Sequence, residues 1–143
     1  MTIVIGSDHA GYELKMKVAA HLKDMGYDIY DVGCDSTDPV DYPVYGQKAG
    51  QALMAGKGDL GMVFCGSGIG ISMAANKVKG VRCALVTSVE MAKLAKQHNN
   101  ANMLAMGGRL IPTEFAIQMT DAWLNAEFLG GHHEKRVKML DEM

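Results

Sequence analysis

The sequence predicts a doubly wound α/β fold with a five-stranded parallel sheet, on the basis of three observations. Five short apolar segments alternate along the chain with amphipathic segments, as repeated βα units do. The apolar segments are hydrophobic at nearly every position, which indicates strands that are buried on both faces and therefore a parallel sheet. The chain has 143 residues, the usual size of one domain, so we expect a single domain over residues 1–143.

The first part of the chain predicts two strands with a helix between them. We expect the first strand over residues 2–7 and the second over residues 27–32. The intervening helix has a buried face whose apolar residues recur at helical spacing: Leu14, Val18, Leu22 and Met25. Gly26 stands where a glycine commonly ends a helix. Residues 33–43 contain two prolines and predict a loop.

Three further strands are expected over residues 60–64, 82–87 and 102–106, each of them rich in aliphatic side chains and Met. Right-handed crossovers between parallel strands would place helices on both faces of the sheet. Ligands of such folds bind beyond the carboxyl ends of the strands. The residues that directly follow the strands are therefore the first candidates for a functional site.

Two more helices are predicted after the fourth and fifth strands. Their buried faces are formed by residues at helical spacing: Met91, Leu94, Ala95 and His98 in one, Phe115, Met119, Ala122 and Trp123 in the other. Thr87 and Glu90 fit a capping box before the first of these helices, and Pro112 fits the first turn of the second. A terminal helix is expected over residues 134–140.

Composition and charge exclude several classes of protein. The formal net charge is −2, which gives no basic footprint for nucleic acid. Neither a signal peptide nor a membrane span is visible, so we expect a cytoplasmic protein with no membrane partner. Cys34, Cys65 and Cys83 are an odd number of cysteines, which indicates free thiols in a reducing compartment. No Cys-x-x-Cys pair or His-Glu-x-x-His motif predicts a zinc site.

The strongest local signal is the segment 64–70, Phe-Cys-Gly-Ser-Gly-Ile-Gly, at the predicted turn from the third strand into a helix. In such a turn the backbone amides point inward, and the positive end of the helix attracts an anion. The same environment favours the thiolate form of Cys65. The alternatives are that the glycines only allow close packing and that Cys65 is a small buried residue. The spacing does not fit the dinucleotide-binding pattern Gly-x-Gly-x-x-Gly.

Three other places carry polar side chains suited to catalysis or phosphate binding. Asp8 and His9 follow the first strand and would reach the same crevice if the first and third strands are neighbours. Alternatively, Asp8 caps the next helix and His9 is merely exposed. His98 opens a polar cluster before the fifth strand, where a structural role is the alternative. His132 and Arg136 are four residues apart, which suits a phosphate monoester on one helix face, or else a solvated basic end.

With these residues the sequence resembles the family of type B ribose-5-phosphate isomerases and galactose-6-phosphate isomerases along nearly the whole chain. The matching segments are 6–11 (Gly-Ser-Asp-His-Ala-Gly), 41–43 (Asp-Tyr-Pro), 65–70, 74–77 (Ala-Ala-Asn-Lys), 98–99 (His-Asn), 107–109 (Gly-Gly-Arg) and Arg136. The resemblance implies a Rossmann-like three-layer α/β/α sandwich and an aldose–ketose isomerase that interconverts ribose 5-phosphate and ribulose 5-phosphate. It also implies a homodimer or a dimer of dimers with an interfacial active site, and no metal or organic cofactor.

The resemblance also implies a role for each matching residue. Cys65 would abstract the C2 proton, while Ser67 and the neighbouring amides would stabilise the enediolate. His98 would assist ring opening, and Asp8 would move a proton between the oxygens on C1 and C2. The residues that would bind the sugar or its phosphate are Asp8, His9, Tyr42, Gly66, Ser67, Gly68, Ile69, Gly70, Asn99, Arg109, His132 and Arg136.

One departure from the family pattern bears on the substrate. Many ribose-type members carry arginine at the position of His132, and histidine is only partly charged near neutral pH. A hexose phosphate, either allose 6-phosphate or galactose 6-phosphate, is therefore the alternative substrate. Cys65 argues against the galactose-6-phosphate subunit type that lacks the cysteine. Outside this class, the alternatives are a non-catalytic sugar-phosphate sensor and a flavodoxin-like nucleotide module.

Overall fold

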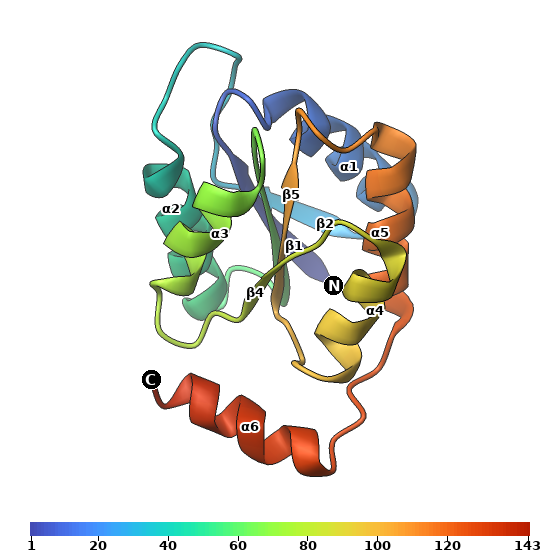
Figure 1. The fold of residues 1–143 in the computed structure, drawn as a ribbon. Helices are drawn as coiled ribbons and strands as arrows, with labels where there is room; N and C mark the ends of the chain where they lie inside the picture. The colour runs from blue at the N-terminus through green and yellow to red at the C-terminus, as the bar shows by residue number, and fades with distance from the viewer.

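The computed structural model describes all 143 residues as a parallel sheet with helices on both faces (Figure 1). The strands are β1 (Thr2–Ser7), β2 (Asp28–Asp31), β3 (Leu60–Cys65), β4 (Cys83–Leu85) and β5 (Met103–Gly107). The helices are α1 (Tyr12–Asp24), α2 (Tyr42–Met54), α3 (Ile69–Asn76), α4 (Val89–Gln97), α5 (Thr113–Asn125) and α6 (His132–Asp141). The predicted α/β/α sandwich with five parallel strands is confirmed.

The strand order is β2-β1-β3-β5-β4, with every neighbouring pair parallel. This order differs from the flavodoxin-like order 2-1-3-4-5, because β5 lies between β3 and β4 and leaves β4 at the edge. As expected, β1 and β3 are neighbours. The carboxyl ends of β1, β3 and β5 consequently lie side by side.

The two faces of the sheet are packed by separate clusters of buried side chains. Ile5 and Phe64 point toward α1, α4 and α5, whereas Val4 and Val63 point toward α2 and α3. This division follows from the alternation of side chains along a strand. Each fully buried aliphatic or aromatic side chain contributes roughly 1.5–3 kcal/mol relative to leaving it exposed. Both faces of β1 and β3 are therefore fixed, which holds their carboxyl ends in place.

Some details differ from the predictions. Ser88, not Thr87, caps α4, because the Ser88 Oγ accepts the Met91 amide at 3.1 Å. Pro112 lies just before the first turn of α5 and not within it. Met25 and Met91, predicted on buried helix faces, are 46% and 42% exposed. Thr87 and Ser88 are adjacent and both suit an N-cap, so the sequence does not decide between them. Met side chains adapt to buried and exposed positions alike, so their burial is hard to predict.

Helix α6 lies at one end of the molecule, apart from the two helix layers (Figure 1). It begins at His132, two residues before the predicted start, and only Val137 among its ten residues is buried. None of the helices combines the length and the apolar character needed to cross a bilayer.

Candidate active site

One open cavity of about 640 Å³ lies at the carboxyl ends of β1, β3 and β5. Its lining residues are Asp8, His9, Ala10, Tyr42, Cys65, Gly66, Ser67, Ile69, Gly70, Met73, Arg109 and Leu110. Most of the predicted site residues are thus brought together where a doubly wound fold binds its ligands.

The turn between β3 and α3 presents a backbone amide to the thiol of Cys65. The Gly68 amide donates to the Cys65 Sγ at 3.2 Å, and the Ile69 amide donates to the Ser67 Oγ at 3.2 Å. Gly68 has φ +80°, a left-handed conformation that favours glycine. The start of α3 therefore places one backbone amide against the sulfur, at the positive end of the helix dipole.

The loop after β5 brings Arg109 to the same place. The Gly108 amide donates to the Cys65 carbonyl at 2.7 Å, and the Arg109 amide donates to the Gly66 carbonyl at 3.0 Å. The two loops approach so closely that a Cβ on Gly107 would lie 2.6 Å from the Ser67 carbonyl group. Glycine at position 107 is therefore required for the Arg109 side chain to reach the cavity.

Asp8 is buried and its carboxylate organises the turn that follows β1. Its Oδ1 accepts the amides of Ala10 and Gly11 at 2.9 and 3.0 Å. The N-cap residue of α1 is Gly11, so the alternative that Asp8 caps this helix is wrong. Asp8 instead holds the turn that precedes the helix. Its second oxygen, Oδ2, accepts no hydrogen bond from the protein.

His9 is held by a strap, residues 33–41, which crosses from β2 to α2. The His9 Nδ1 accepts the Val40 amide at 3.1 Å, so this bond places the ring proton on Nε2. His9 can thus offer an N–H donor to an anion in the cavity. The alternative that His9 is merely exposed is not what the structure shows.

The strap is anchored by a fully buried lysine. The Lys15 Nζ donates to both carboxylate oxygens of Asp31 at 2.8 and 3.0 Å and to the Cys34 carbonyl at 2.7 Å. The amide of Gly33 donates to the same carboxylate of Asp31. Because Lys is rarely buried unless it is paired, this arrangement indicates a specific role in holding the strap against α1.

The remaining predicted residues form a second group outside the cavity. Gly68 lies in the turn but does not line the cavity, and His98, Asn99, His132 and Arg136 lie away from it. Instead, the His98 ring stacks on the His133 ring with centroids 4.3 Å apart, and His132 adjoins His133 at 4.1 Å. Desolvation, followed by the neighbouring charges of His132, His98 and Arg136, lowers the pKa of His133. Within one chain the predicted site residues therefore fall into two separate groups.

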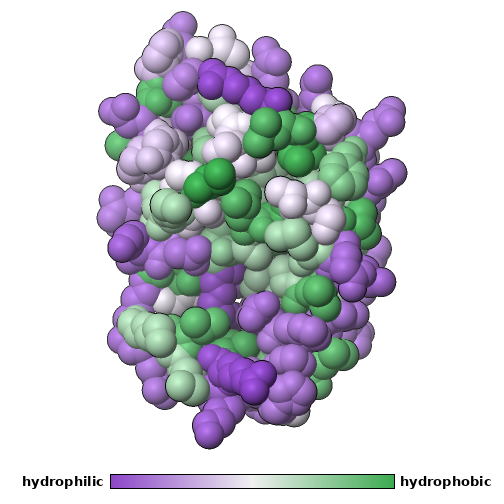
Figure 2. Space-filling view, in the orientation of Figure 1, coloured by the Kyte–Doolittle hydropathy of each residue, from purple (hydrophilic) through white to green (hydrophobic).

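Sequence reasoning missed His133, and of the apolar rim of the cavity it named only Ile69. Ile69, Met73 and Leu110 line the cavity and are 47%, 62% and 65% exposed. Figure 2 shows hydrophobic side chains gathered on the upper half of this face of the molecule. Ile69 and Met73 are one helical turn apart, a spacing that could have revealed the rim.

A thiol, backbone amides and a guanidinium thus surround one cavity, and the comparison with known families identifies the class of protein as a sugar-phosphate isomerase of the aldose–ketose type. The family model described as Ribose/Galactose Isomerase matches residues 3–140. The chain belongs to this family.

Individual relatives are similar over nearly their whole length. The chain is 41% identical over 138 residues to ribose-5-phosphate isomerase B of Escherichia coli, covering 96% of this chain and 93% of the relative. The structure of ribose-5-phosphate isomerase B from Clostridium thermocellum superposes with a TM-score of 0.97 at 47% identity, covering 99% and 96% of the two chains. The structure of ribose-5-phosphate isomerase B from Mycoplasma genitalium, solved with bound ribulose-5-phosphate, superposes with a TM-score of 0.93 at 39% identity. The match covers 99% of this chain and 94% of that chain.

Proposed function

We propose that this chain interconverts ribose 5-phosphate and ribulose 5-phosphate through an enediolate, with Cys65 as the base. The observation that carries the proposal is the Cys65 Sγ, which lies at the cavity and accepts the Gly68 amide at 3.2 Å. Proton abstraction next to a carbonyl group requires both a base and stabilisation of the developing oxyanion. The turn of residues 66–70 supplies amides beside that base.

These positions support the following proposed reaction. The Cys65 thiolate takes the proton from C2 of the open-chain aldose, and the electron pair moves onto the carbonyl oxygen of C1. Amides of the turn and the Ser67 hydroxyl stabilise this oxyanion, an effect worth about 2.7–4 kcal/mol per donor. The Oδ2 of Asp8 moves a proton from the hydroxyl on C2 to the oxygen on C1. Returning the proton from Cys65 to C1 then gives the ketose.

The second group of residues completes the site from another copy of the chain in this proposal. His98 would open the sugar ring and Asn99 would contact the sugar, while His132 and Arg136 would bind the phosphate together with His9 and Arg109. The exposed apolar rim around the cavity supports the proposal, because a second copy would remove it from water. The assembly is then a homodimer or a dimer of dimers.

Coexpression of two inactive variants tests the shared site. Cys65→Ala and His98→Asn should each be inactive alone, whereas a mixed dimer contains one site with both native halves. Random pairing should restore about a quarter of the wild-type activity per chain. If each site were built within one chain, the mixture would stay inactive.

A substrate panel tests the reaction itself. The EDTA-treated protein is assayed with ribose 5-phosphate, allose 6-phosphate and galactose 6-phosphate. The proposal expects ribose 5-phosphate to have the highest kcat/KM. Preference for a hexose phosphate would support the second candidate class of substrate. His132 favours that class, because many ribose-type members carry arginine at this position. Binding without turnover would indicate a sensor.

A further inference from the structure

Helix α6 carries His132 and Arg136 but has little hydrophobic anchorage. Only Val137 of this helix is buried, and a cavity of about 450 Å³, lined by Leu140 and Met143, separates its end from the segment before β4. Figure 2 shows this face hollowed between the body of the molecule and the lower end. Most helices in proteins are stabilised by packing of an apolar face. The position of α6 therefore depends on the stack of His133 on His98 at its start and on polar contacts at its end.

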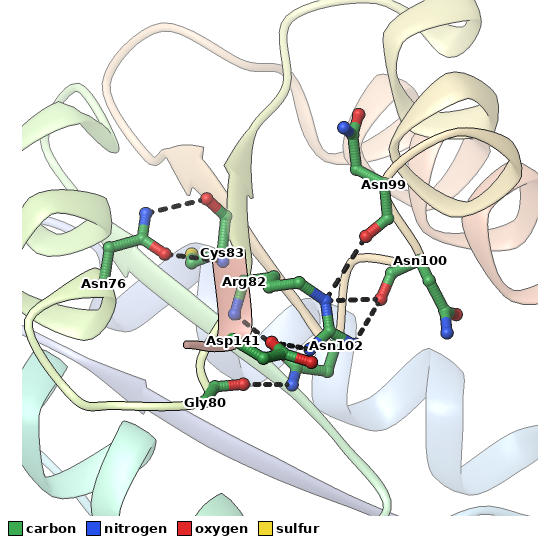
Figure 3. A network of polar contacts seen from close by, with 8 residues as sticks. All are labelled: Asn76, Gly80, Arg82, Cys83, Asn99, Asn100, Asn102 and Asp141. Atoms are coloured by element: carbon green, nitrogen blue, oxygen red, sulfur yellow. Dashed lines mark hydrogen bonds and ion pairs between the residues drawn. The ribbon is translucent and has the colours of Figure 1, made fainter. Parts of the chain in front are cut away.

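Arg82 makes contacts of this kind and joins two segments far apart in the sequence (Figure 3). Its Nη1 donates to the Asp141 Oδ1 at 2.6 Å, and its Nη2 donates to the Asn100 carbonyl at 2.9 Å. Its Nε is shared between the carbonyls of Asn99 and Asn100 at 3.3 Å each. The guanidinium thus links the last turn of α6 to the turn that carries His98.

The backbone around Arg82 is itself held by two asparagine side chains, one on each side of the segment that enters β4. The Asn102 Oδ1 accepts the Arg82 amide at 2.7 Å, while its Nδ2 donates to the Gly80 carbonyl at 2.9 Å. Asn76 bonds both the amide and the carbonyl of Cys83 at 2.8 and 2.9 Å. The Asn76 side chain pairs with the free edge of β4, whereas Asn102 lies on the side of β5, and together they fix the backbone that carries Arg82 (Figure 3).

The charge of Asp141 supports a specific role for the ion pair. Asp141 is the last residue of α6, where the negative end of the helix dipole disfavours an acid. Arg82 compensates for this charge, and its own side chain is only 16% exposed. Lysine could not replace it, because a single ammonium group lacks the planar fork that reaches three acceptors in different directions.

We infer that Arg82 is a positioning residue for the isomerase reaction, acting with Asp141. It holds α6 against the 98–100 turn, so that His132 and Arg136 meet the phosphate while His98 and Asn99 meet the sugar. The inference rests on the proposed function of these four residues.

The test compares Asp141→Asn with Glu142→Gln, a matched control on the neighbouring acid that forms no ion pair. Asp141→Asn should raise the KM for ribose 5-phosphate about tenfold and change kcat less than about twofold, because it frees only the phosphate-binding helix. Arg82→Lys also frees the 98–100 turn and should both raise KM and lower kcat. Glu142→Gln should match the wild type, and Asp141→Glu should restore most of the lost affinity.

Hydrogen exchange of the α6 amides provides a second readout that does not depend on turnover. Asp141→Asn should speed exchange in α6 relative to Glu142→Gln, with the core strands unchanged. If the wild type is active but Asp141→Asn leaves the KM or the hydrogen exchange of α6 unchanged, the inference is overturned while the proposed function stands. A wild-type chain that turns over no sugar phosphate would instead overturn the proposed function.

Discussion

Replacing Gly68 by alanine should damage both stability and turnover. Gly68 is the residue whose amide bonds the Cys65 thiol, and it has φ +80°. A Cβ at this position would lie 2.8 Å from the Met106 carbonyl carbon, 3.0 Å from the Gly107 amide and 2.8 Å from a Leu85 methyl group. Two of these neighbours are backbone atoms of β5 and its loop, so they cannot rotate away.

The size of the effect follows from two contributions. A left-handed conformation costs an alanine about 1–2 kcal/mol, and forcing extra volume into a packed site typically costs about 1–3 kcal/mol. The free energy of unfolding should therefore fall by about 2–5 kcal/mol, which lowers Tm by about 5–20 °C in a chain of this size. Displacing one amide donor from the oxyanion should lower kcat by about 100-fold or more.

Gly66→Ala is the matched control in the same turn. Its Cβ would lie 3.4 Å from an Arg109 nitrogen and 3.5 Å from the Ala10 Cβ, which are ordinary contacts. Urea unfolding followed by circular dichroism should show Gly66→Ala within about 1 kcal/mol of the wild type. Wild-type stability in Gly68→Ala, or an equal loss in Gly66→Ala, would refute the reasoning.

Three further predictions concern the strap and the cysteines. Lys15→Met should lower the free energy of unfolding by about 2–3 kcal/mol, since it removes charged hydrogen bonds to Asp31 and Cys34; a loss under about 0.5 kcal/mol in urea would contradict this. Iodoacetate at pH 8 should label Cys65 first and substrate should protect it, whereas equal labelling of all three thiols in mass spectra would not fit. Burial raises the pKa of the Cys83 thiol from 9.0 to about 12, so its contribution to stability is complete below pH 9 and is lost as the pH rises from about 9 toward 12. From pH 8 to 10 the wild type should lose about 1.4 kcal/mol more than Cys83→Ala, and identical pH dependence would argue against the shift.

The sequence predicted the strands and one half of the site because these depend on local pattern and on simple topology. Continuous apolar segments identify buried parallel strands, and residues that follow parallel strands share one edge of the sheet. Asp8, Cys65 and Arg109 therefore could be placed in one crevice. The position of β5 between β3 and β4 could not be predicted, because no local signal specifies strand pairing.

Contacts made by loops and by helix α6 also lay beyond sequence reasoning. The bond from the Val40 amide to His9 depends on the path of the strap, which Lys15 fixes from another element. The stack of His133 on His98 and the reach of Arg82 to Asp141 join residues 35 and 59 positions apart. Such long-range polar contacts leave no periodic pattern in the sequence.

The most direct test of the central claim follows the C2 proton itself. Wild-type protein and Cys65→Ala are incubated with ribose 5-phosphate in D2O, and deuterium at C1 and C2 is measured by NMR alongside the Kd for the sugar phosphate. The account predicts that the wild type incorporates deuterium, while Cys65→Ala keeps its affinity and loses exchange by about 100-fold or more. Exchange at the wild-type rate in Cys65→Ala would contradict the assignment of Cys65 as the base.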